Sequence, residues 1–172
     1  MSQLKSYTIF GIIFVIISGS LFHFLYQWSN NNFIVGLFTP VNESIWEHMK
    51  LLFFPMLLYF LIAAPKLKDS YPCITSAIAS GLLIGTLLIP VIFYTYTGIL
   101  GYSLFILDIL AFILSVMAAF YFVYSLASTC RMQNHAYLLY LAVYLLAIAF
   151  LVFTYCPLSL RLFADPAMTS KS

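Results

Sequence analysis

The sequence predicts an all-α integral membrane protein, a bundle of five transmembrane helices, on three observations. Of the 172 residues, 64% are hydrophobic and only 7% are charged, whereas soluble domains carry about 45–50% apolar and about 25% charged residues. The charged residues divide the chain into long uncharged stretches, and a helix of about 20 apolar residues crosses a bilayer. These stretches are continuously apolar, unlike the alternating segments of a membrane β-barrel.

This composition excludes a soluble enzyme, a nucleic-acid-binding domain and a disordered chain, because so few charges cannot solvate a surface of this size. We expect the protein in the cell membrane, crossing it several times, with the lipid bilayer as a partner and no nucleic acid. The cysteines Cys73, Cys130 and Cys156 lie far apart, without CxxC or CxxH spacing. A disulfide framework or a zinc ribbon is therefore not expected.

The first span is expected at residues 7–27, after Lys5 and before the polar run 29–32. Its apolar stretch continues beyond the small residues 18–20, which favours an uncleaved span over a signal peptide.

The second span is expected at residues 45–64. The uncharged stretch 51–65 is too short to cross a bilayer alone, so the helix must begin earlier. Ser44 and Glu47 fit an S-x-x-E capping box. We therefore expect the helix to begin at about Ser44, with Glu47, His48 and Lys50 in its opening turns and with Glu47 and Lys50 paired at i, i+3.

The remaining spans are expected at residues 73–96, 102–127 and 135–156. Pro90 should kink the third, and a turn at Thr97-Gly98 with Gly101 should end it. Residues 161–172 are expected to form a loose polar tail.

The distribution of Lys and Arg predicts an orientation, since these residues are enriched in cytoplasmic loops. On the N-terminal side lie four, Lys5, Lys66, Lys68 and Arg131; on the other side lie three, Lys50, Arg161 and Lys171. The bias predicts a cytoplasmic N-terminus and an external C-terminus.

This topology brings most of the rare polar side chains to one end of the bundle, the outer leaflet in the predicted orientation. The candidates for binding a ligand or a proton are His23, Glu43, Glu47, His48 and Asp108. Ionisable groups at membrane depth are costly and usually face the bundle interior or water. We therefore expect these five side chains to converge on one pocket.

Imidazoles and carboxylates together suit a divalent metal such as zinc, and the metal ligands expected are His23, His48, Glu47 and Asp108. The same groups could move a proton. Structural roles compete with these interpretations: Glu47 could only cap its helix, His48 and Lys50 could extend to the headgroups, and Trp28 and Trp46 suit an aromatic belt at the membrane surface.

The stretch Phe38-Thr39-Pro40-Val41-Asn42-Glu43-Ser44-Ile45-Trp46-Glu47-His48, with Gly19 to Trp28 before it, resembles a family of small bacterial polytopic membrane proteins of unknown function. That family carries a Pro-Val-Asn-Glu-Ser-x-Trp-Glu-His motif after an early His-Phe. The resemblance covers most of the chain, implies a polytopic fold and supplies no activity.

The segment from Asn42 to His48 is also similar to a stretch in the membrane hydrolase superfamily of adiponectin-receptor-like proteins and alkaline ceramidases. That similarity implies that Ser20, His23 and Asp108 correspond to the Ser, His and Asp of those proteins. The superfamily has seven spans and a late His-x-x-x-His pair, whereas the fifth span here offers only His135, on the opposite side.

Three functions follow as hypotheses. The first is a binding or transport-type protein whose polar pocket takes a cation, a proton or a small polar ligand, working as a homodimer or with a partner membrane subunit because five helices are few for a lone transporter. The second is an intramembrane metal-dependent hydrolase, in which a metal-activated water attacks a lipid amide or ester. The third is a scaffold subunit without chemistry.

Overall fold

The computed structural model, which describes residues 2–165, contains five helices long and apolar enough to cross a membrane, as the sequence predicts. They are α1 (Ser2–Trp28), α3 (Ile45–Leu67), α4 (Ile74–Leu100), α5 (Phe105–Thr129) and α6 (Ala136–Phe153). Three short helical segments lie between or after them: α2 (Phe33–Phe38), η1 (Gln133–His135) and η2 (Arg161–Phe163). No β-strand occurs in residues 2–165.

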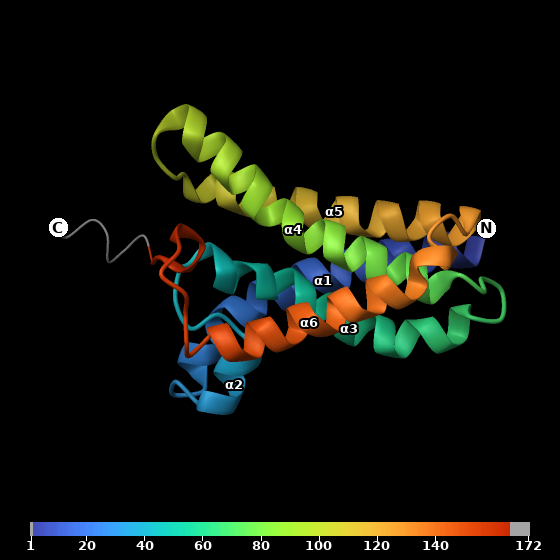
Figure 1. Ribbon diagram of the computed structural model, residues 1–172, viewed down its shortest axis with the longest axis horizontal. Helices are drawn as coiled ribbons and strands as arrows, with labels where there is room; N and C mark the ends of the chain where they lie inside the picture. The colour runs from blue at the N-terminus through green and yellow to red at the C-terminus, as the bar shows by residue number, and fades with distance from the viewer. Residues whose placement is uncertain (1, 166–172) are drawn as a thin grey trace.

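The long helices form a bundle with two distinct ends (Figure 1). The start of α1 and the loops 68–73 and 130–135 lie at what we call the N-terminal end. The segment α2, the turn 101–104 and η2 lie at what we call the α2 end. The arrangement of the helices is compatible with either orientation in a membrane, so the cytoplasmic N-terminus stays a prediction.

The core is centred on α3, α4 and α5, and side chains of α1 and α6 complete it. The helix α4 packs most extensively on α5 and also against α3 and α6, while α1 packs on α3 and α5. Large apolar side chains of α3, α5 and α6 fill the interior, among them Phe53, Met56, Phe60, Phe120 and Phe150. The α2 ends of α4 and α5 diverge together from the other helices (Figure 1).

Small residues set the close contact between α4 and α5. A Cβ added at Gly81 would lie 2.5 Å from the backbone oxygen of Ala119, and one at Gly85 would lie 3.0 Å from that of Ser115. Backbone atoms cannot rotate away, so these glycines let the two helices approach each other.

Substituting Gly81 with alanine is expected to destabilise the protein by about 1–3 kcal/mol, as overpacking does in other cores. Gly98 is the matched control in the same helix, because an added Cβ there meets nothing within 4 Å. Gly98→Ala should leave stability unchanged or raise it by up to about 1 kcal/mol, since alanine favours a helix. Unfolding in detergent measures both, and equal effects of the two substitutions would contradict this packing.

Three details differ from the sequence-based expectations. The helix α4 continues through Thr97 and Gly98 to Leu100 and ends at Gly101, whose φ of 81° is left-handed. The helix α2 was not expected, although Asn32 accepts hydrogen bonds from the backbone N–H groups of Ile34 and Val35 as its N-cap. Phe163 of η2 packs on the Trp46 ring at 4.8 Å between centroids, so residues 161–163 are not loose; residues 166–172 of the expected tail lie outside the described residues.

The spacing of the cysteines predicts no disulfide framework, but the structure contains one disulfide. Cys73 and Cys130 form one across 57 residues of sequence. Cys73 is the N-cap of α4 and Cys130 the C-cap of α5, so the antiparallel packing of the two helices brings the cysteines together. The spacing of Cys73 and Cys130 along the sequence cannot predict this pair, because tertiary packing brings the two residues together.

Candidate metal site

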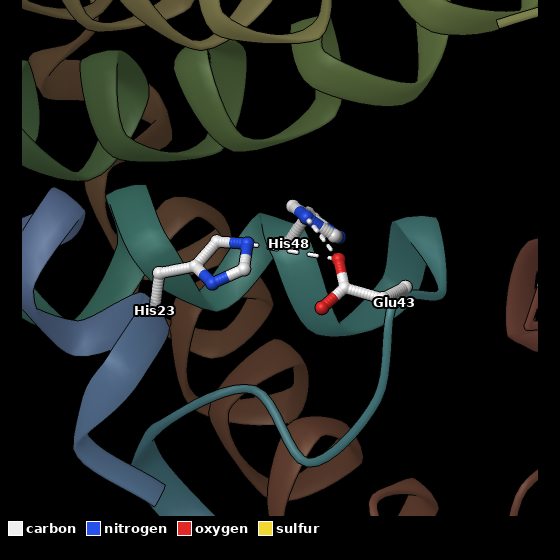
Figure 2. A group of neighbouring side chains, drawn as sticks. All are labelled: His23, Glu43 and His48. Carbon is white, nitrogen blue, oxygen red and sulfur yellow. Dashed lines mark ion pairs between the residues drawn. The ribbon is translucent and has the colours of Figure 1, made fainter. Parts of the chain in front are cut away.

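Three of the five candidate residues meet at the α2 end. His23 comes from α1, Glu43 from the loop between α2 and α3, and His48 from the opening turns of α3. Both imidazole rings point toward the Glu43 carboxylate (Figure 2). The same oxygen, Oε2 of Glu43, lies 3.4 Å from Nε2 of His48 and 3.6 Å from Nε2 of His23. One ligand atom from each of the three residues lies within 4.8 Å of the others.

Close packing of α1 on α3 brings the two histidines together. Gly19 lies one turn before His23, and a Cβ added there would lie 2.5 Å from the backbone oxygen of Leu51. Leu51 follows His48 by three residues, so the contact lies beside the site. The ring centroids of His23 and His48 are consequently 5.2 Å apart.

The start of α3 is capped as the sequence predicts, with one change. The helix begins at Ile45, and Ser44 Oγ accepts a hydrogen bond from the N–H of Glu47. In a full capping box the glutamate would return the bond to the N–H of Ser44. That N–H instead donates to Asn42 Oδ1 at 3.0 Å, and the Glu47 carboxylate is free to bond elsewhere.

The His48 ring has a defined tautomer. Its Nδ1 lies 2.9 Å from the Ser44 carbonyl oxygen, and a carbonyl can only accept, so Nδ1 carries the proton. The lone pair of a neutral ring is therefore on Nε2, the atom that faces Glu43. Metal-binding histidines usually hold their second ring nitrogen in this way, by donating to a carbonyl or a carboxylate.

The separations between these atoms fit an ion pair of Glu43 with a protonated imidazole, and they also fit a shared metal ion. An N–H···O bond has a donor–acceptor distance of about 2.7–3.2 Å, and both separations from Glu43 exceed it. Two ligands at about 2.0–2.1 Å from a tetrahedral zinc ion lie about 3.3 Å from each other. The two separations from Glu43 are close to that value, and the third, between the ligand nitrogens of the two histidines, is at most 4.8 Å.

Glu47, the fourth candidate, does not join this group in the described residues. Its carboxylate oxygen Oε2 accepts a hydrogen bond from the Val41 N–H at 3.0 Å and one from the Lys50 ammonium at 2.7 Å. Both side chains are buried, with exposed fractions of 0% for Lys50 and 2% for Glu47. The predicted i, i+3 pair is confirmed, and the expectation that Lys50 could extend to the headgroups is wrong.

Lys50 connects three segments at the α2 end. Besides Glu47, its ammonium donates to the Gly36 carbonyl at 3.1 Å and to Thr154 Oγ1, while the Thr39 carbonyl lies at a longer 3.4 Å. The three N–H groups of the ammonium are thereby matched by partners on α2, α3 and the end of α6. This network holds the loop that carries Glu43.

Asp108, the fifth candidate, lies in another environment. Tyr96 of α4 donates a hydrogen bond to its carboxylate across the turn that joins α4 and α5, and Asp108 is not part of the group of His23, Glu43 and His48. The cost of a partly buried acid in an apolar helix is therefore offset by a phenol. The sequence alone does not show whether Asp108 pairs with Tyr96 or with the group of His23, Glu43 and His48.

Two other expectations concern Trp46 and the pocket. Trp46 is buried among Phe150, Phe153 and Phe163, so its assignment to an aromatic belt is wrong, whereas Trp28 is exposed. The five candidates do not gather at one point, because Glu47 and Asp108 bond to other partners. An apolar cavity of about 320 Å³ lies between α3, α4 and α6, and none of the candidates is among its lining residues.

Comparisons with known proteins identify a family of unknown function and add no activity. No curated protein and no solved structure matches the chain. The similarity to the membrane hydrolase superfamily stays an expectation. Residues 1–171 match a family of unknown function (DUF6512), and the chain therefore belongs to this family.

Proposed function

We propose that the protein binds one divalent transition-metal ion, such as zinc, through His23, Glu43 and His48. The observation that supports this most directly is that three separate segments direct their ligand atoms at one point, within 4.8 Å of one another. Two neutral imidazoles and one carboxylate are ligands that zinc prefers. The ammonium of Lys50 does not oppose a cation here, because Glu47 neutralises it.

The site has room for a further ligand. The exposed fractions of the His23, His48 and Glu43 side chains are 29%, 25% and 55%, so the rest of the protein does not enclose any of the three. Three protein ligands leave a position of a tetrahedral ion open to water or to a ligand molecule. The role that we favour is a binding or transport-type one, in which the ion enters and leaves at the α2 end.

A metal-dependent hydrolase is the second candidate, because an open position on the ion would hold a water molecule. Such an enzyme also needs a general base within reach of that water. Glu47 adjoins His48 in the sequence, but its Oε2 already accepts hydrogen bonds from the Lys50 ammonium and the Val41 N–H. This engagement makes us favour ion binding over hydrolysis.

Zinc titration of protein purified in detergent tests the proposal, with a chromogenic chelator as competitor. We expect one zinc ion per chain in the wild type and loss of that ion in His23→Gln and His48→Gln. The matched control is His135→Gln, because His135 lies in η1 at the N-terminal end, away from the site. Zinc binding that is equal in all four proteins would reject the site, and no binding in any of them would leave the scaffold role as the better hypothesis.

A further inference from the structure

The cysteines divide the bundle into two chemically different ends. At the N-terminal end the disulfide Cys73–Cys130 joins the loop before α4 to the loop after α5. At the α2 end Cys156, just beyond α6, is a free and exposed thiol. The disulfide and the thiol are separated by the length of the transmembrane helices, so each belongs to one side of the membrane.

Disulfides persist in oxidising compartments outside the cytoplasm and are rare where glutathione and thioredoxin keep thiols reduced. In forming this bond, the two thiols give up two protons and two electrons to a disulfide-bearing thiol oxidase of the outer compartment, whose own disulfide becomes a dithiol. Cys130 is exposed and can meet such an oxidant. An exposed thiol such as that of Cys156 stays reduced more readily in the cytoplasm than outside it.

From this division we infer that the N-terminal end of the bundle lies outside the cytoplasm and that the α2 end faces the cytoplasm. The His23–Glu43–His48 group then takes its ion from the cytoplasmic metal pool. The identity of the ligand rests on the proposed function, whereas the orientation rests on the cysteines alone. The inferred orientation is the reverse of the one predicted from the distribution of Lys and Arg.

The charge bias is weaker than the argument from the cysteines. Lys50 is buried in its ion pair and does not count as a loop charge. Four Lys and Arg residues then lie at the N-terminal end, against Arg161 and Lys171 beyond the last span. The positive-inside rule describes a bias in such counts, and a difference of two is small. A disulfide in the cytoplasm would oppose the reducing systems of that whole compartment.

Labelling with a membrane-impermeant maleimide in right-side-out and inside-out membrane vesicles tests the orientation. We expect Cys156 to react in inside-out vesicles only. Cys73 and Cys130 should react in right-side-out vesicles, and only after treatment with an impermeant phosphine reductant. The variants Cys156→Ser and Cys73→Ser/Cys130→Ser assign the two signals. Ser159→Cys in the Cys156→Ser background supplies a second probe at the α2 end, in case the Cys156 thiol reacts slowly.

Reaction of Cys156 or of the Ser159→Cys probe in right-side-out vesicles would overturn the inference. So would reaction of Cys73 and Cys130 without reduction, because the disulfide would then be missing. The labelling does not depend on bound metal. A protein that binds no zinc but labels as expected would reject the proposed function and keep the orientation, and the opposite combination would do the reverse.

Discussion

Replacing Lys50 with methionine is expected to lower the free energy of unfolding by about 3–5 kcal/mol, the usual cost of removing one partner of a buried ion pair. The substitution leaves the Glu47 carboxylate buried and without its strongest donor. It also removes the donor that the Gly36 carbonyl and Thr154 share. Thermal and denaturant unfolding in a mild detergent would measure the loss.

Lys66 provides the matched control, because it lies in the same helix and is exposed. Lys66→Met should change stability by no more than about 0.5 kcal/mol, as expected for a surface substitution. The double variant Glu47→Gln/Lys50→Met should lose less than the sum of its two single variants, since neither partner is then left charged and alone. If Lys50→Met were as stable as Lys66→Met, the account of this network would be wrong.

Replacing Glu43 with glutamine is expected to weaken zinc binding by about 100-fold or more. Loss of a residue that only supports a metal ligand costs about 10–100-fold in affinity, and Glu43 is proposed to contact the ion itself. The amide keeps the shape of the side chain but removes its charge. Competition with a chelator of known affinity measures the change.

Asp108→Asn is the informative comparison for that result. Both substitutions remove one carboxylate charge near the α2 end of the bundle. Asp108, however, bonds to Tyr96 and not to the histidines. Its substitution should leave zinc affinity unchanged. Equal weakening by the two variants would show that the affinity reflects overall charge and not a site at Glu43.

The sequence predicts the fold well because composition and length determine it. Twenty apolar residues without a charge have few alternatives to a membrane helix, and five helices of this kind are present. The capping signal at Ser44 is local in the sequence, so it also placed the start of α3 correctly.

Predictions that depend on tertiary packing are less accurate. His23, Glu43 and His48 meet because Gly19 allows α1 to approach α3, whereas Glu47 and Asp108 have the same chemistry and bond to other partners. The spacing of Glu47 and Lys50 predicted that pair, but no local pattern predicted Tyr96 as the partner of Asp108. The disulfide depends in the same way on the packing of α4 against α5.

X-ray absorption at the zinc edge of the zinc-loaded protein tests the central claim most directly, because it reports the atoms bound to the ion. The proposed site predicts two imidazole nitrogens and at least one oxygen at about 2.0–2.2 Å, with one imidazole lost in His48→Gln. A spectrum with a sulfur ligand at about 2.3 Å, which would indicate Cys156, would contradict the account. So would a spectrum without imidazole, or one that His48→Gln leaves unchanged.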